Sequence, residues 1–575
     1  MEKRPWPQVE NKDFGDAAVV IIGAGIAGMC TAIDLIRKNN CRNFIILERG
    51  SGIGGTWNDN RYPGCCCDVP SIMYSFSFEQ NPNWSRKYPG QEEILNHLHA
   101  IAEKWGLYRH TRFNSAATDA RWDDEEMKWK TTVKICGDKD SEYSSGYTIT
   151  SDFLVSAVGQ LNEPKMPSIP GLDSFKGKIM HTARWDWSYD LEGKRIAVIG
   201  NGATGIQVVP ELVKVASHVT QYIRTPGWII PRLDTSVSTL QRLAYQYSPP
   251  LLWRHRAEIF TWMDNTFKKV VWNPENPESK MARQWNRALL QATWPKDEEL
   301  WEKLTPDYPP GCKRILFSDD YYPALTKPNC SLEMRPISRI TESGIEVEGG
   351  DVEEFDLIVC ATGFHAGAYF VRAIDVQGEG GRPISDIWRH YPQALYGISL
   401  ESLPNFGMLY GPNTNLNHSS IILMIEAQSN YISGLVEEVL YAKKLGLPLA
   451  ITPKKDRLEE FNEMVQEKLK ETSYSHPTCN SWYKSPDGKR VVANWCGSVV
   501  EYQTQLSKIA WSDYDVKGAA AEVVLKGKKE KKIGRVVEET MVSNMALATG
   551  VLGAVAVVGG CLLHANGYLR RFQRR

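Results

Sequence analysis

The sequence lacks several features that would point to particular classes of protein. Its 575 residues carry 67 Lys and Arg against 68 Asp and Glu, a net charge of −1. A chain so close to neutral gives no indication of a nucleic-acid or polyanion partner. No run near Met1 has the basic, apolar and small-residue layout of a signal peptide. No short-period repeat is present, whereas hydrophobic residues make up 42%, enough for the cores of several domains.

Cysteine is present, but not in the spacings that carry metal or redox chemistry. The 12 cysteines are scattered, and no two pairs have the C-x-x-C spacing of a structural zinc site. Three are contiguous, Cys65 to Cys67, and three adjacent side chains cannot comfortably face one metal. We therefore predict no metal site, mostly free thiols and a reducing compartment.

A glycine-rich turn follows the first apolar run of the chain. Residues 17–22 read as a buried parallel strand, and Gly23, Gly25 and Gly28 after it form the pattern G-x-G-x-x-G before a helical segment. The free N–H groups of such a helix start bind a pyrophosphate. Glu48, about 20 residues later, ends the next strand and can accept hydrogen bonds from ribose hydroxyls. The pattern predicts an FAD or NAD site that repels a 2′-phosphate.

A second glycine-rich turn repeats this arrangement with the opposite charge. The apolar run 195–199 leads into Gly200, Gly202 and Gly205, and a helical pattern follows. The next strand ends in Arg224, where the first unit has its glutamate. A guanidinium at this point can bind a 2′-phosphate bidentately, so this unit is predicted to bind NADPH. Two such units in one chain suggest hydride transfer from NADPH to a flavin.

These signals predict an α/β fold with two Rossmann-like dinucleotide-binding domains. We expect the FAD-binding domain over residues 1–165 and its return part over 355–525. The NADP-binding domain is expected over 166–354, with a helical insertion at about 236–304 where aromatic and charged residues recur at helical spacing between prolines. Residues 526–575 are expected to form a basic linker and an apolar tail.

The tail has the composition of a membrane anchor. Residues 526–532 are rich in lysine, and residues 545–565 contain no Asp, Glu, Lys or Arg. That uncharged stretch has about the 20 residues needed to cross a bilayer core. We predict a single-pass C-terminal anchor with the catalytic domain in the cytosol; a buried helix and a disordered tail are the alternatives.

A longer motif lies just before the second glycine turn. Phe175, Gly177, His181, Trp185 and Asp186 complete the pattern F-x-G-x-x-x-H-x-x-x-W-[P/D]. In this the chain resembles the type I Baeyer–Villiger monooxygenases of the flavin-containing monooxygenase superfamily. Related N- and S-oxidising enzymes have a similar histidine motif but usually lack the Trp-Asp ending.

Further motifs extend the resemblance over about residues 15–515. The family pattern G-x-W-x-x-x-x-[F/Y]-P-G-x-x-x-D is complete as Gly55, Trp57, Tyr62, Pro63, Gly64 and Asp68, and the interdomain turn of the family matches Ala361, Thr362 and Gly363. The chain departs from the family at Asn58 and Asp59, where aromatic residues are common, and at the three cysteines before Asp68. Both changes bear on substrate preference.

The resemblance also implies residue roles. Arg314, in the segment Gly-Cys-Lys-Arg, is implied to be the catalytic arginine, with Asp68 pairing with it and Lys313 helping to bind the NADP phosphate. His181 and Trp185 are implied to link domain movement to turnover. The cofactor-binding residues implied in addition to the glycines, Glu48 and Arg224 are Thr56, Trp57, Tyr74, Thr204 and Thr225.

The resemblance implies an FAD- and NADPH-dependent enzyme that inserts one oxygen atom of dioxygen next to a ketone carbonyl, giving an ester or lactone. A role in secondary metabolism is one interpretation, and a monomer is expected. The alternatives are an N- or S-oxidising flavin monooxygenase and a non-catalytic, membrane-tethered nucleotide-binding protein. A disulfide reductase would need C-x-x-x-x-C after Gly54-Gly55, which is missing.

Overall fold

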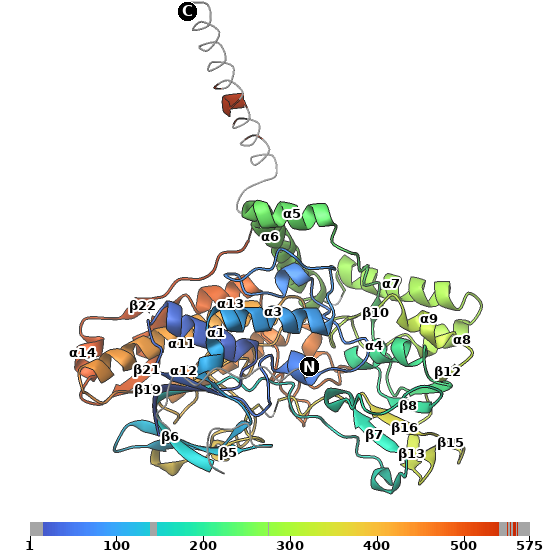
Figure 1. Ribbon diagram of the computed structural model, residues 1–575, viewed down its shortest axis with the longest axis horizontal. Coiled ribbons are helices and arrows are strands. Elements are labelled where there is room, and N and C mark those ends of the chain that lie inside the picture. Colours follow the sequence, from blue (N-terminus) through green and yellow to red (C-terminus); the bar gives the residue numbers. More distant parts are fainter. Residues whose placement is uncertain are drawn as a thin grey trace, which may run out of the picture.

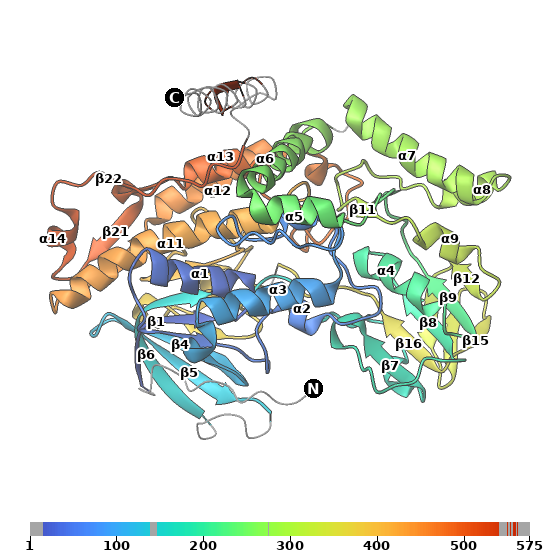
Figure 2. The same cartoon turned by 45° about the horizontal axis from the view of Figure 1, so that its top comes forward.

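Two lobes, each built on its own sheet, lie side by side in the computed structural model of the chain (Figure 1). The structure describes residues 15–137, 146–273, 275–367 and 369–539, and a few positions between 549 and 561. Helices α5 and α6 cover one end of the molecule, and the turned view in Figure 2 keeps the same division.

The first lobe is organised around a strand that is apolar after its first residue. In β1 (Asp16–Ile22) the residues from Ala17 onward are buried, as expected for a central parallel strand. It lies between β2 (Phe44–Leu47) and β6 (Gly146–Ser156) and runs parallel to both. The sheet is completed by β3 (Thr111–Arg112), β4 (Ser115–Asp123), β5 (Lys128–Ile135), β17 (Asp375–Gln377) and β18 (Phe406–Met408).

The late part of the chain returns to this lobe. Strand β18 pairs with β6, and β17 pairs with β4. Helix α11 (Ile421–Lys444) packs beside α1 (Ile26–Arg37), where Ser429 donates a hydrogen bond to Asp34 at 2.7 Å. The first sheet is therefore covered by helices from both ends of the sequence (Figure 1).

The second lobe is a doubly wound parallel sheet in the order β12–β9–β8–β16–β7. Its strands are β7 (Lys178–His181), β8 (Arg195–Ile199), β9 (His218–Tyr222), β12 (Cys330–Glu333) and β16 (Leu357–Cys360). Strand order reverses between β8 and β16, and ligands of such sheets bind at that crevice. Helix α4 (Ala203–Leu212) follows β8. We expected β16 in the return part of the first domain, but it pairs with β7 and β8, so that boundary was set too early.

Helices occupy the stretch in which the sequence predicts a helical insertion. They are α5 (Thr239–Tyr247), α6 (Pro249–Thr266), the π-helical turn η5 (Phe267–Val271), α7 (Pro277–Thr293) and α8 (Glu298–Lys303). Each of the two long helices begins at a proline, which is suited to a first helical position because its missing N–H has no partner there in any case.

The remaining elements connect and cover the two sheets. The other helices are α2 (Thr56–Asp59), η1 (Ser71–Met73), α3 (Gln91–Lys104), η2 (Leu107–His110), η3 (Leu172–Ser174), η4 (Thr182–Arg184), α9 (Tyr321–Leu325), η6 (Glu379–Gly381), α10 (Ile384–Ile387), α12 (Lys455–Leu469), η7 (Ser473–Ser475), α13 (Val499–Gln505), η8 (Trp511–Asp513) and α14 (Ala521–Leu525). The other strands are β10 (Ile229–Ile230), β11 (Leu316–Phe317), β13 (Ile337–Ile340), β14 (Gly344–Val347), β15 (Val352–Glu354), β19 (Ala450–Pro453), β20 (Lys508–Ala510), β21 (Tyr514–Lys517) and β22 (Glu530–Lys532).

The segment that we expected as a basic linker is part of the folded first lobe. Strand β22 pairs antiparallel with β20. Lys531 donates to Glu438 at 2.9 Å and lies 2.8 Å from Glu437, so its charge is paired with α11. Among the described residues, no helix combines the length and apolarity needed to cross a bilayer. The predicted anchor, 545–565, lies for the most part outside them.

A buried charge cluster fastens the chain after β22 to the helical insertion. Arg256 of α6 donates to both carboxylate oxygens of Glu538, and both side chains are almost fully buried. Glu426 of α11 lies nearby and accepts hydrogen bonds from Ser77 N at 2.6 Å and Ser77 Oγ at 2.7 Å. Burial, and then the charge of Glu538, raises the pKa of Glu426 to about 7.

The raised pKa of Glu426 makes the stability of the fold depend on pH. Its carboxyl ionises more readily in the unfolded chain, so the stability it contributes is complete at acidic pH and is lost as pH rises through about 7. In Glu426→Gln this loss, up to about 3 kcal/mol, is absent. We expect the Tm of the variant to rise relative to that of wild type as the pH is raised from about 5 to about 8. Parallel Tm curves would contradict the assignment.

Candidate functional site

Both glycine turns form backbone cradles that side chains could not occupy. A Cβ on Gly28 would lie 1.9 Å from the carbonyl oxygen of Gly23, and one on Gly205 would lie 2.3 Å from that of Gly200, so α1 and α4 begin tight against their strands. A Cβ on Gly202 would meet nothing within 4 Å, which leaves open space at the start of α4. Neither helix has a side-chain N-cap bond in the described structure, so both starts suit a pyrophosphate.

The first cradle extends to the motif that begins at Gly55. The backbone of Gly55 approaches Gly25 so closely that a Cβ on Gly55 would lie 2.8 Å from the Cα of Gly25. After it, Thr56 and Trp57 open α2, and the Trp57 indole donates to the Tyr74 hydroxyl at 3.0 Å. The structure thus brings these predicted cofactor residues together beside the first glycine turn.

Glu48 lies beside the same turn and orders it. Its carboxylate accepts hydrogen bonds from the backbone N–H groups of Ala24 at 2.8 Å and Gly50 at 2.7 Å. Burial raises its pKa, and these two hydrogen bonds oppose that rise. An acceptor-only side chain in this position suits the hydroxyls of a ribose and disfavours a phosphate there.

At the second cradle two cations face the same region. Arg224 follows β9 and is exposed, and Lys313 is half-buried with its ammonium 4.6 Å from the ring centre of Tyr308. Burial, and then the positive charge of Arg224, lowers the pKa of Lys313. Neither cation forms a carboxylate ion pair within the part of the chain that is described. Two neighbouring cations that form no ion pair fit a phosphate group. Thr225 is held close by, since its carbonyl accepts from Asn201 at 3.0 Å.

Arg314 and Asp68 form a bidentate ion pair. Arg314 donates from Nε to one carboxylate oxygen and from Nη2 to the other, the latter at 2.7 Å. Nη1 donates to the carbonyl oxygen of Leu416 at 3.4 Å. Burial disfavours the charged guanidinium, but the charge and hydrogen bonds of Asp68 outweigh it, so the pKa of Arg314 lies above its ordinary value. Arg314 therefore stays positively charged at every working pH.

The loop that carries Asp68 is packed against the second lobe. The Tyr62 hydroxyl donates to the Gln207 side chain of α4 at 2.8 Å, and a Cβ on Gly64, whose φ is +77°, would lie 2.5 Å from the Gln207 carbonyl oxygen. These contacts explain the tyrosine and glycine of the motif: they place Asp68 between the lobes.

The signature residues lie at both ends of β7: Phe175 and Gly177 precede the strand, and His181 ends it at the carboxyl edge of the second sheet. His181 ends β7, accepts from the Ala183 N–H at 3.1 Å and therefore donates from Nε2 to the Gly363 carbonyl oxygen at 2.9 Å. Burial lowers its pKa, in keeping with this neutral form. Phe175 is buried, with Gly177 against its ring.

The interdomain turn meets the same edge. A Cβ on Gly200 would lie 2.5 Å from the Ala361 carbonyl oxygen, and Thr362 donates to the Lys165 carbonyl oxygen at 2.6 Å. Trp185 stacks edge to face with Trp187, and Asp186 accepts from Lys178 at 2.7 Å, which holds the pKa of Asp186 at about 2. Thr204 lies in the first turn of α4. The signature, the turn and the second cradle are thus one structural unit.

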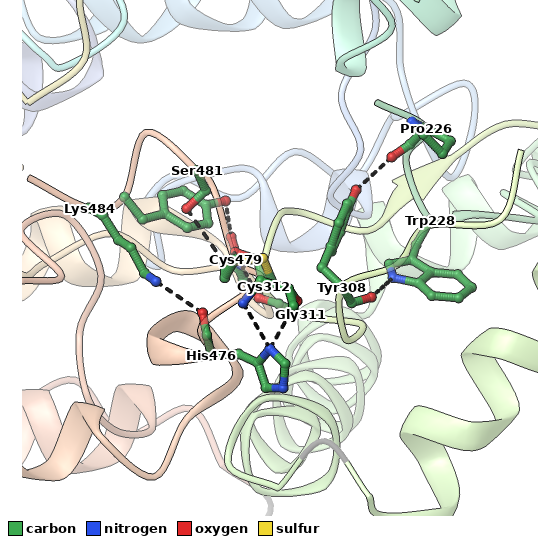
Figure 3. Close-up of a disulfide and its surroundings, with 12 residues drawn as sticks. Pro226, Trp228, Tyr308, Gly311, Cys312, His476, Cys479, Ser481 and Lys484 are labelled. Atoms are coloured by element: carbon green, nitrogen blue, oxygen red, sulfur yellow. Dashed lines mark hydrogen bonds between the residues drawn. A yellow bond between two sulfur atoms is a disulfide. The ribbon is translucent and has the colours of Figure 1, made fainter. Parts of the chain in front are cut away.

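A disulfide that we did not predict joins Cys312 to Cys479, with 5.7 Å between their Cα atoms (Figure 3). The expectation of mostly free thiols holds for the other described cysteines but not for this pair. No pattern in the sequence indicated it, because the two cysteines are 167 positions apart and no spacing rule connects them. The disulfide fixes the residue that directly precedes Lys313 and Arg314 to the loop 476–485.

Two further residues, Asn417 and Tyr483, support the same segment, although no role was predicted for either. Asn417 donates to the Gly311 carbonyl oxygen at 3.1 Å, and its side-chain oxygen accepts from the Tyr483 hydroxyl. The three adjacent cysteines, in contrast, have no visible chemistry: burial raises the pKa of Cys65 to about 12 and that of Cys66 to about 11, so both are protonated thiols at neutral pH.

Comparison with known proteins places this site in a family. The model of the flavin-binding monooxygenase-like family matches residues 16–373. The chain is 48% identical over 563 residues to the FAD-binding monooxygenase ktnD of Aspergillus niger, covering 97% of this chain and 91% of the relative. It is 38% identical over 508 residues to a Baeyer–Villiger monooxygenase of Streptomyces coelicolor, covering 87% and 92%.

A solved structure agrees in fold and cofactors. The OTEMO complex with FAD and NADP superposes with a TM-score of 0.75 at 25% identity, covering 87% of this chain and 99% of that one. The two cradles described above fit those two cofactors. The chain therefore belongs to the flavin-binding monooxygenase-like family, as an FAD- and NADP-dependent enzyme of the Baeyer–Villiger type.

Proposed function

We propose that the enzyme inserts one oxygen atom of dioxygen between the carbonyl carbon and a neighbouring carbon of a ketone, giving an ester or lactone. The observation that supports this reaction best is the ion pair of Arg314 and Asp68, placed between the lobes. Oxygen insertion of this kind passes through negatively charged oxygen, and a fixed cation stabilises such charge without rearranging during the reaction.

FAD, when bound, supplies the reduction and oxygen chemistry, and the protein positions and protects it. Gly23, Gly25 and Gly28 would hold its pyrophosphate, and Glu48 its ribose. Arg314 offers positive charge at the site, and Asp68 fixes the plane of the guanidinium by accepting two of its N–H groups. Arg314 is not proposed to transfer a proton, because its pKa is raised.

NADPH is proposed to bind the second cradle. Gly200, Gly202 and Gly205 would receive its pyrophosphate, and Arg224 with Lys313 would bind the 2′-phosphate. Since Lys313 is the residue next to Arg314, the nucleotide and the catalytic cation share one backbone segment. His181 would transmit the position of the second sheet to the turn at Gly363, with which it is hydrogen-bonded.

We further propose that residues 545–565 tether the enzyme to a membrane. Their length and lack of charged residues support this, although most of them lie outside the described structure. The direct test is whether a full-length chain in which Leu552 and Val555 are both replaced by lysine leaves the membrane fraction.

The reaction is tested by product analysis with NADPH in air. A ketone panel should yield products heavier by one oxygen atom, with the oxygen in an ester or lactone. Products from amines or sulfides alone would establish N- or S-oxidation instead. NADPH consumption without any oxygenated product, over all three classes, would reject the proposal.

Arg314→Ala should separate reduction from oxygenation. Loss of one fixed charge at a developing oxyanion typically lowers turnover about 10²- to 10³-fold. We expect ester formation to fall by this factor while NADPH still bleaches the flavin under anaerobic conditions. Arg335→Ala, which removes an exposed arginine of the second lobe, is the matched control. Ester formation at the wild-type rate in Arg314→Ala would refute the role.

Arg224→Ala should weaken NADPH but not NADH. Losing a charge-assisted hydrogen bond of about 1.5–3 kcal/mol raises the KM for NADPH about 10- to 100-fold. The KM for NADH should hardly change, because NADH has no 2′-phosphate. Arg195→Ala, at the start of β8 and paired with Glu353, is the control. Equal losses for both nucleotides would mean that Arg224 does not read the phosphate.

Breaking the disulfide should loosen Lys313 and Arg314 together. We expect Cys479→Ser to raise the KM for NADPH and to lower the ester formed per NADPH consumed, with the difference released as hydrogen peroxide. Treatment of wild type with a dithiol should give the same change and leave the variant unaffected. Cys136→Ser, a free thiol elsewhere, serves as control. Unchanged coupling in Cys479→Ser would show that the disulfide does not position the segment.

A further inference from the structure

Helix α5 turns its apolar face away from the protein. Leu240, Leu243 and Tyr247 are spaced by three and four residues and so share one face. Their exposed fractions are 78%, 44% and 79%. No residue of α5 is fully buried. In a surface helix of a globular protein the apolar stripe faces the core, so this helix is inverted.

The inner face of α5 is the polar one. Gln241, Arg242 and Tyr245 are half-buried. Gln241 donates to the Tyr245 hydroxyl at 2.7 Å, and that hydroxyl is hydrogen-bonded to His255 of α6. The polar contacts that hold α5 to α6 therefore fix the orientation that exposes the leucines.

Further exposed apolar residues flank α5 in the sequence. Leu233 before it and Leu251 and Trp253 after it are 66%, 49% and 58% exposed. Helix α6 buries a different stripe, which includes Leu252 and Phe260. Single exposed apolar residues are common, but several on one helix and at the start of the next mark a surface for contact with another apolar body. Figure 1 shows α5 at the top of the molecule, above α6.

The attachment point of the C-terminal segment indicates which partner covers this apolar surface. The buried pair of Arg256 and Glu538 fixes the chain to α6, immediately beside α5. Met545 follows Glu538 by seven positions, which a chain spans over at most about 25 Å. The length of the chain therefore limits how far the start of the uncharged stretch 545–565 can be from the Arg256–Glu538 pair.

The charges on the insertion show which part of a lipid would be recognised. Arg254 is paired with Glu258 at 3.0 Å, Lys269 with Glu278 at 3.3 Å, and Arg256 with Glu538. These three cations are neutralised by carboxylates. Arg242 of α5 is half-buried and donates to Thr239 Oγ1 at 3.4 Å. The exposed side chains of the face are leucine, tyrosine and tryptophan, and these enter the boundary between headgroups and acyl chains. The surface suits an uncharged bilayer interface and does not require anionic lipid.

We propose that the outer face of α5, continued by Leu251 and Trp253, is a second membrane contact that lies flat in the bilayer interface. The choice of a membrane as the occupant rests on the proposed tether at 545–565. Together the two contacts would fix the orientation of the enzyme on the membrane, with α5 and the start of α6 against the lipid.

The experiment uses full-length chains and flotation with phosphatidylcholine vesicles. In a chain with Leu552→Lys and Val555→Lys, which removes the tether, reversible binding through α5 should remain and should change little with salt. Adding Leu240→Glu and Leu243→Glu should lower the partition coefficient about tenfold or more, since two buried leucines are lost. Tyr441→Glu with Leu445→Glu, at the end of α11 and similarly exposed, is the matched control and should have no effect. Flavin reduction by NADPH should be unchanged in all chains.

The possible failures are distinguishable. If the tether variant alone abolishes vesicle binding, the α5 proposal is overturned and the tether stands. If vesicle binding needs Leu240 and Leu243 but not Leu552 and Val555, the tether fails and the α5 contact stands. If the glutamates at α5 instead convert a dimer into a monomer in sedimentation and leave vesicle binding unchanged, the face belongs to a second copy and the proposal is overturned.

Discussion

The ion pair of Arg314 and Asp68 is the interaction on which the arrangement of the site depends. Taking two charges out of water is costly unless the geometry is good and the remaining hydrogen-bonding groups are satisfied. Here the carboxylate accepts two N–H groups of one guanidinium, and the third nitrogen donates to a backbone carbonyl. The loop before Asp68 is fixed to α4 through Tyr62, and the segment before Arg314 is fixed through Asn417 and the disulfide. Every one of these contacts serves to hold one cation between two nucleotide cradles.

The two cradles have almost the same backbone and differ in charge. Each begins with a buried parallel strand and turns through a glycine into the start of a helix, so each suits a pyrophosphate equally well. What separates them lies at the end of the second strand of each unit: the carboxylate of Glu48 in one and the guanidinium of Arg224 in the other. Glu48 also orders its own turn by accepting two backbone N–H groups, whereas Arg224 is exposed and Lys313 is half-buried over Tyr308, and neither forms a carboxylate ion pair in the described structure. We propose that these side chains decide which cradle takes the flavin nucleotide and which takes NADP.

In the proposed function, the placement of Lys313 next to Arg314 would couple binding of the nucleotide phosphate to the reaction. The disulfide at Cys312 ties the segment that carries both residues to Cys479 (Figure 3). A second arginine also joins distant parts of the chain: Arg256 of the helical insertion is paired with Glu538 of the segment after β22. In both places one arginine joins parts of the chain that are more than 200 residues apart in sequence.

The sequence by itself determined the two cradles, their charges and the order of the lobes, because strand, glycine turn and helix are local patterns whose spacing is set by backbone geometry. Arg314 and Asp68 were found only through the resemblance to a family, since nothing local distinguishes them from surface charges. The disulfide, the support from Asn417 and Tyr483, and the place of β16 in the second sheet were decided by tertiary structure. Each joins residues brought together by chain crossings that leave no periodic signal. The orientation of α5 belongs to the same group: its amphipathic pattern predicts a helix with one apolar face, but only packing through Gln241, Tyr245 and His255 decides that this face points outward.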